Sequence, residues 1–221
     1  MWPAAMTTSR SATTSAGHTT AVETSAVPGG ATARGEPGAR RTSTPDTVAT
    51  EVRIRPLLDG EATTVLAVFA GLDARSRELR FLAPKPQLTP NDLAQLAHVD
   101  NHDRVALVAE LPDGRPVGIA RFVRYPGDAG VADVAVEVVD RWQRRGIGAQ
   151  LIQALAERAR AVCLRRFTVH MLQQNVGSMR LMRHAGGAVR TVETDEHSAE
   201  FEITLPHPHG DQLASTLCHA R

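Results

Sequence analysis

The stretch 138–151 constrains the fold more than any other part of the sequence. An apolar run passes there through a basic turn with two glycines and enters a helical pattern. The first turn of a helix has backbone N–H groups without partners and partial positive charge, so it favours phosphate oxygens. Gly146 and Gly148 lack a Cβ and let a ligand approach the backbone closely, and Arg144 and Arg145 add positive charge. The stretch therefore predicts a strand, a phosphate-binding turn and a helix.

Composition divides the 221 residues into three parts. Residues 1–48 are rich in Thr, Ser, Ala, Gly and Pro and contain almost no large apolar side chains. Such a segment cannot bury enough surface to offset the entropy lost on ordering. We therefore expect a disordered tail over 1–48, one folded domain over 49–207 and a short tail over 208–221. Hydrophobic residues make up 42% of the chain, which is enough for one sizeable core.

Charge and cysteine usage exclude several classes of protein. The formal net charge is +1 and aromatic residues amount to 4%, with the arginines scattered, so nothing favours a nucleic-acid partner. No apolar run approaches the roughly 18–20 residues of a membrane span, and the N-terminus lacks a secretory signal pattern. The two cysteines, Cys163 and Cys218, have no metal-ligand spacing. We therefore expect a cytoplasmic protein in a reducing compartment, with no metal and no membrane partner.

Hydrophobic periodicity predicts the order strand, helices, three strands, helix, strand, helix and two strands. Asp59 is the expected N-cap of the first helix. An antiparallel strand leads into the glycine turn and no Gly-Lys-Ser/Thr follows it, which excludes a P-loop and disfavours a dinucleotide fold. The predicted strands cover 51–56, 105–111, 116–125, 131–139, 167–172, 189–192 and 199–205. The predicted helices lie around 65–69, around 75–81, from residue 89 onward, over 147–162 and over 175–184.

The turn Gln143–Ala149 resembles the Gln/Arg-x-x-Gly-x-Gly/Ala motif of the GCN5-related N-acetyltransferase (GNAT) superfamily, and the predicted element order is that of the superfamily. The resemblance implies an α/β fold with a mixed, mainly antiparallel sheet of about seven strands flanked by helices. It also implies acetyl-CoA as co-substrate and no metal. The implied cofactor-binding residues are Val138 and Val139 for the pantetheine arm, Gln143, Arg144, Arg145, Gly146, Ile147, Gly148 and Ala149 for the pyrophosphate, and Asn175 on the later helix.

Two further segments are similar to a narrower group, the bacterial Pat-type protein lysine acetyltransferases. These segments are 76–81 and 99–109. The similarity implies that the acceptor is a lysine side chain of a protein, with an acyl-CoA synthetase as the candidate. A small-molecule amine is the alternative acceptor, because a fold by itself says little about substrate. A second alternative is a regulatory module that binds acyl-CoA without turning it over.

Two carboxylates, Asp133 and Glu137, precede the turn on one predicted strand. Acyl transfer needs a neutral amine, whereas a free lysine has a pKa of ~10.4, and a positioned base contributes on the order of 10²–10⁴-fold. Pat-like enzymes have a glutamate at the position that corresponds to Asp133, so the resemblance implies Asp133 as general base, acting through a bridging water. Glu137 is the second candidate. Strict alternation places both carboxylates on one face, unless a bulge intervenes.

No general acid is assigned. Many relatives have a tyrosine on the later helix that protonates the departing thiolate, and the equivalent position here is Met182. A CoA thiolate is a competent leaving group without such an acid. Cys163 as an acyl carrier in a two-step mechanism is the weaker alternative, because it lies at an apolar helix end with no histidine beside it.

Overall fold

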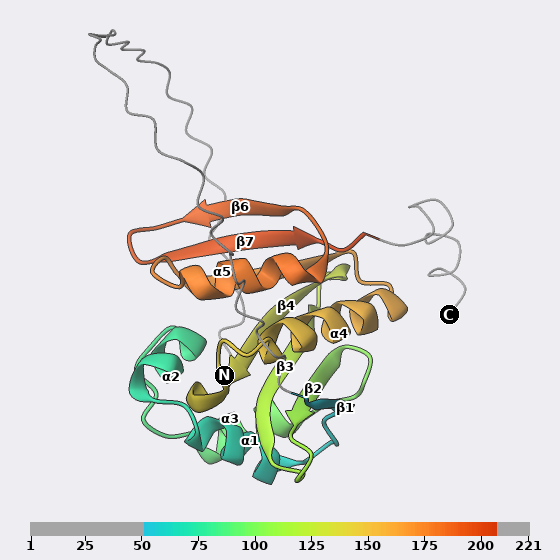
Figure 1. Ribbon diagram of the computed structural model, residues 1–221. Coiled ribbons are helices and arrows are strands. Elements are labelled where there is room, and N and C mark those ends of the chain that lie inside the picture. The colour runs from blue at the N-terminus through green and yellow to red at the C-terminus, as the bar shows by residue number, and fades with distance from the viewer. Residues whose placement is uncertain (1–50, 207–221) are drawn as a thin grey trace, which may run out of the picture. The chain divides into compact units, whose positions relative to one another are not determined.

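The computed structural model describes residues 51–206, except for the side chain of Val176, so the predicted tails 1–48 and 208–221 lie outside the described residues. Its centre is a seven-stranded sheet of order β1-β2-β3-β4-β5-β7-β6 (Figure 1). All neighbouring strands are antiparallel except β4 and β5. The predicted mixed, mainly antiparallel sheet of about seven strands is confirmed. The strands are β1 (Arg53–Pro56), β2 (Arg104–Glu110), β3 (Pro116–Tyr125), β4 (Asp128–Val138), β5 (Arg166–Leu172), β6 (Val189–Thr194) and β7 (Ser198–Thr204).

Helices cover both faces of this sheet (Figure 1). One apolar cluster packs α4 and the end of α5 against one face, and a second cluster packs α1 and α3 against the other. Two short 3₁₀ turns, η1 (Asp140–Trp142) and η2 (Arg183–Ala185), precede α4 and follow α5. The helices are α1 (Ala62–Ala70), α2 (Ala74–Phe81), α3 (Pro90–Ala97), α4 (Ile147–Ala161) and α5 (Val176–Met182).

The apolar stripe of α4 is a large part of the first cluster. Leu151 and Leu155 are fully buried against strand residues that include Phe122 and Phe167, whose ring centroids lie 6.0 Å apart. Burying one such aliphatic side chain contributes about 1.5–3 kcal/mol. This packing fixes α4 on the sheet and therefore fixes the position of the turn at its N-terminus.

The pairing of β4 with β5 is short, and this feature positions the site. Val131, Ala132 and Asp133 pair in parallel with Arg166, Phe167 and Thr168. The register of β4 against β3 continues without a shift from Ala132 to Val138, on the opposite edge of β4. Beyond Asp133, β4 therefore has one paired edge and one edge that faces an opening in the sheet.

The expectation that Asp59 caps α1 is wrong. The N-cap of α1 is Glu61, and no side chain caps it among the described residues. The Asp59 carboxylate accepts hydrogen bonds from the Val99 backbone N–H and the His98 ring, both at 3.0 Å. These two partners lower the pKa of Asp59. Local sequence predicted that the Asp59 carboxylate caps α1, but it bonds instead to donors about 40 residues later in the chain.

Gly187, just after η2, allows a close approach of backbone to β7. A Cβ built on Gly187 would lie 1.5 Å from the carbonyl oxygen of Thr204, and backbone atoms cannot yield as a flexible side chain can. We expect Gly187→Ala to lower the free energy of unfolding by about 2 kcal/mol or more in urea denaturation.

Gly127→Ala is the matched control, because a Cβ there has no neighbour within 4 Å. It should stay within about 0.5 kcal/mol of the wild type. Equal stabilities of the two variants would contradict the close approach of Gly187 to β7.

Candidate functional site

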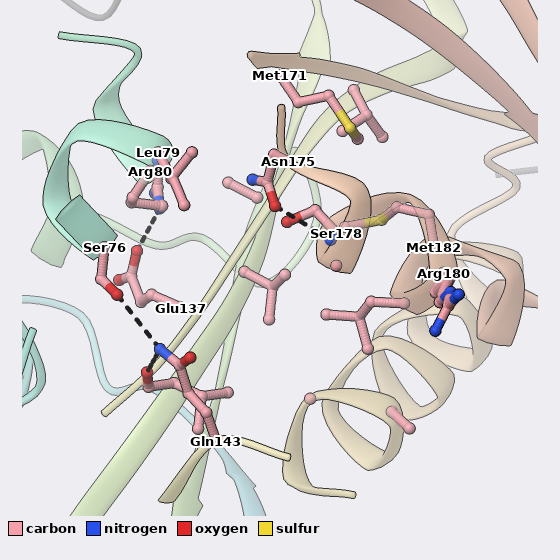
Figure 2. A pocket seen from close by; sticks show the side chains of 18 of the residues that line it. Ser76, Leu79, Arg80, Glu137, Gln143, Met171, Asn175, Ser178, Arg180 and Met182 are labelled. Carbon is pink, nitrogen blue, oxygen red and sulfur yellow. Dashed lines mark hydrogen bonds and ion pairs between the residues drawn. The ribbon is translucent and has the colours of Figure 1, made fainter. Parts of the chain in front are cut away.

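A cavity of about 410 Å³ lies where β4 and β5 separate (Figure 2). Its floor and walls come from the second half of β4, the end of β5, the first turn of α4, and the helices α2 and α5. Residues far apart in the sequence are thus combined in one hollow. The residues that line the cavity include Ser76, Arg80, Glu137, Val138, Gln143, Arg144, Gly146, Gly148, Asn175 and Met182.

The first turn of α4 opens onto this cavity without a cap. Gly146 is the N-cap, in the left-handed region at φ 80°, and no side chain caps the turn among the described residues. Arg144 also has a positive φ, 58°, a conformation that costs a non-glycine residue on the order of 1 kcal/mol and often marks a functional site. The first N–H groups of α4 and their partial positive charge are therefore presented to a ligand in the cavity.

The open edge of β4 runs along the same cavity. The Val139 N–H donates to Val117 of β3 at 2.9 Å. In an antiparallel pair, alternate residues point their backbone groups to opposite sides. The N–H and C=O groups of Val134, Val136 and Val138 therefore point away from β3, toward the opening. An extended polar chain could pair with them as an added strand would.

The helix α5 closes the cavity on the side of β5. Asn175 is its N-cap, and its side-chain oxygen accepts a hydrogen bond from the Ser178 N–H at 3.1 Å (Figure 2). Gly148 of α4 allows α5 to approach, because a Cβ there would lie 3.1 Å from the nearest methyl group of Leu181. A side chain at Gly148 would therefore crowd the contact between α4 and α5.

Glu137 lies in the wall of the cavity and forms an ion pair with Arg80 of α2 (Figure 2). The two side chains are only 8% and 5% exposed. Arg121 of β3 is equally buried, 4.0 Å from the other Glu137 oxygen, and donates to the Leu96 carbonyl at 2.6 Å. Burial lowers the pKa of Arg121 to about 10, against the opposing effect of the Glu137 charge. The Glu137 carboxylate is therefore committed to two guanidinium groups.

Asp133 lies at the closed end of the opening, one residue before the cavity-lining Val134. Because the β3–β4 register is continuous there, Asp133 and Glu137 lie on the same face of β4, as strict alternation predicted. Tyr125 is next to Asp133: burial, then the charges of Asp133 and Glu200, raise its pKa to about 12, while a hydrogen bond with Thr168 opposes them. The closed end of the opening is therefore polar.

The structure brings most of the predicted site residues to the cavity. The lining includes Glu137, Val138, Gln143, Arg144, Gly146, Gly148, Ala149 and Asn175, but not Asp133, Val139, Arg145 or Ile147. Val139 and Ile147 are buried in the apolar clusters. The Arg145 guanidinium lies 4.8 Å above the Trp142 ring.

Sequence reasoning did not assign the wall formed by α2. Ser76, Leu79 and Arg80 line the cavity, and their spacing of three to four residues is that of one helical face. The segment 76–81 indicates only a family similarity, because its local sequence pattern does not show which face of a polar helix lines a cavity. Met171 and Met182 are both buried and line the cavity.

The comparisons with known proteins agree with this geometry. The sequence matches the model of the Acetyltransferase (GNAT) family over residues 72–186, just over half of the 221-residue chain. The chain therefore belongs to the GNAT family of acetyltransferases.

Among proteins of known sequence, it is 32% identical over 154 residues to the acetyltransferase Pat of Mycolicibacterium smegmatis, covering 69% of this chain and 45% of that protein. The chain thus spans less than half the length of this relative.

Two solved structures extend the comparison. The GNAT domain of S. lividans PAT has a TM-score of 0.63 and 27% identity, with 70% of this chain and 90% of that chain covered. The acetyltransferase yncA from Salmonella typhimurium, determined with acetyl-CoA, has a TM-score of 0.56 and 19% identity, with 73% and 98% covered. The second comparison supports the fold alone.

Among residues 51–206, no three His, Cys, Asp or Glu side chains are grouped so that they could hold a metal ion. No helix there is long and apolar enough to cross a membrane.

Glu137 offers a direct test of the buried ion pair. Glu137→Gln leaves Arg80 and Arg121 buried without their anion, so we expect a loss of about 3 kcal/mol in the free energy of unfolding. The control is Glu78→Gln, the same substitution in the more exposed pair of Arg75 and Glu78, which should cost less than about 0.5 kcal/mol. Similar costs in urea denaturation would show that Glu137 is not essential to the packing of α2.

Proposed function

We propose that this protein transfers the acetyl group of acetyl-CoA to the side chain of a protein lysine. One observation carries the proposal: the uncapped N-terminus of α4 and the open edge of β4 line the same cavity. The first fits a pyrophosphate and the second fits an amide-containing arm. Membership of the GNAT family and the resemblance to Pat support the choice of co-substrate and acceptor.

In this proposal, the backbone N–H groups from Arg144 to Ala149 bind the pyrophosphate oxygens of acetyl-CoA. Gly146 and Gly148 keep the approach open, and the charge of Arg144 complements the phosphates. Val136 and Val138 pair with the pantetheine arm along β4, which directs the thioester toward the closed end of the opening at Asp133. Val138 lies five positions after Asp133 along β4, a distance of about 17 Å.

Asp133 is the better candidate for the general base, although it stands one residue beyond the cavity lining. Glu137 already pairs with Arg80 and lies near Arg121, so both of its carboxylate oxygens face guanidinium groups. Asp133 would take the proton of the lysine ammonium through a bridging water. The neutral amine then attacks the thioester carbonyl and forms the C–N bond, the C–S bond breaks and CoA leaves as its thiolate. The second proton on the nitrogen passes to that thiolate or to water.

Two residues considered for other steps fit this direct transfer. Met182 is buried in the cavity wall where many relatives have a tyrosine, so the thiolate leaves without a dedicated acid from this position. Cys163 lies just after the end of α4 and does not line the cavity, which disfavours an acyl-cysteine intermediate. The predicted location in the cytoplasm and the lack of a nucleic-acid partner stay predictions.

Asp133→Asn tests the base. We expect kcat/KM to fall by on the order of 10²–10⁴-fold, with unchanged affinity for CoA in calorimetric titration, because Asp133 lies at the far end of β4 from the turn. The control is Asp128→Asn, at the start of β4, where the carboxylate pairs with Arg166 near the surface; its rate should stay within about twofold of the wild type. If the Asp133 variant is as fast as the wild type across the pH range, the base lies elsewhere.

The acceptor is tested by comparing an acyl-CoA synthetase with small amines such as spermidine and free amino acids. We expect CoA release and acetylation of the synthetase at its active-site lysine, and none after that lysine is replaced by arginine. Strong turnover on a small amine alone would contradict the protein acceptor. Acetyl-CoA binding with no transfer to any acceptor would favour a regulatory acyl-CoA-binding module.

A further inference from the structure

Val139 follows the last residue of β4, and Asp140 comes next. The Asp140 side chain joins three parts of the site. Its carboxylate accepts hydrogen bonds from the Asp73 backbone N–H at 2.5 Å, the Ser76 hydroxyl at 2.6 Å and the Gln143 side-chain amide at 2.7 Å. Two of these donors belong to the start of α2 and the third to the glycine turn. One half-buried carboxylate thus connects segments that are about 67 residues apart in the chain.

The Gln143 amide extends this network to β4. It donates to the Val138 carbonyl at 3.0 Å and lies 3.4 Å from the Ser76 hydroxyl oxygen (Figure 2). The Asp140 backbone N–H also donates to the Gly71 carbonyl at 3.1 Å. The turn, the open edge of β4 and the junction before α2 are therefore held by a continuous set of hydrogen bonds.

Polar contacts at both ends hold α2, together with the packing of Phe81 against Phe69, whose ring centroids lie 5.8 Å apart. None of its eight residues is buried as a whole, and its sequence is strongly polar. At its N-terminal end it is bound by Asp140, and at its C-terminal end Arg80 pairs with Glu137. Yet Ser76, Leu79 and Arg80 form a wall of the cavity across from α5 (Figure 2). A change in the glycine turn would thus reach this wall through Asp140.

We propose that Asp140 is a positioning residue that couples the glycine turn to α2, so that binding of CoA at the turn stabilises the α2 wall of the cavity. The inference rests on the proposed function, because it requires that the turn binds CoA. A ligand that fixes Gln143 and the turn also fixes the Asp140 carboxylate. That carboxylate then holds Ser76 and the first turn of α2 in the docked position. Coupling between two parts of a site is a free-energy relation, so it can be measured with CoA alone.

Hydrogen exchange of the full chain with and without saturating CoA tests the coupling. In the wild type, we expect CoA to slow exchange in the first turn of α4 and, by about fivefold or more, in α2 over residues 74–81. Ser76→Ala removes the hydroxyl link to Asp140, while the Asp73 side chain still caps α2 through the Ser76 N–H. Asp140→Asn removes the carboxylate itself. In both variants CoA should still protect α4 but slow exchange in α2 by less than twofold.

The ratio of exchange rates with and without CoA separates coupling from a merely structural role, because a general loosening of α2 raises both rates and leaves the ratio unchanged. Asp113→Asn is the control: this exposed carboxylate pairs with Arg115 in the β2–β3 turn, and the variant should give wild-type ratios.

Unchanged α2 protection in Ser76→Ala and Asp140→Asn would overturn the inference, as would protection of α4 without α2 in the wild type. No protection of α4 in the wild type would instead reject CoA binding at the turn, and the inference would fall with it.

Discussion

The separation of β4 from β5 after Asp133 is the constraint on which the rest of the site depends. The two strands pair over three residues each, and the next residues of β4 keep only their partner β3. Backbone N–H and C=O groups in a sheet need partners, so the open edge must bind water or a ligand. The glycine turn, α4 and α5 are arranged around this edge. The pairing of the strands therefore creates the cavity, and the side chains that line it set its shape.

The two sides of the cavity are held by different forces. On one side, α4 is fixed by six buried residues of its apolar stripe, which is the non-directional contribution of hydrophobic burial. On the other side, α2 buries no whole residue and is held by the Glu137 and Asp140 carboxylates. Polar contacts of this kind are directional, so they fix α2 in one position as long as their partners keep their geometry.

Features with a local period could be predicted from the sequence, and features with distant partners could not. The stripe of α4, the glycine turn and the alternation of Asp133 and Glu137 on β4 follow from spacing, and the structure agrees with them. The predicted N-cap of α1 was wrong because the Val99 backbone N–H donates to the Asp59 carboxylate. The wall formed by α2 was missed because the partner of Arg80 lies 57 residues later. A sequence pattern shows which face is apolar, but not which distant carboxylate a guanidinium meets.

The two carboxylates of β4 show how position in the sheet divides roles between similar groups. Both lie on one face, four residues apart. Glu137 lies between Arg80 and Arg121, so its carboxylate anchors α2 through an ion pair with Arg80. Asp133 lies where β4 meets β5, beside Tyr125. Environment, and not residue type, sets the chemistry of a carboxyl group. The proposed base is therefore the shorter of the two side chains, because the longer one is already engaged in the packing of α2.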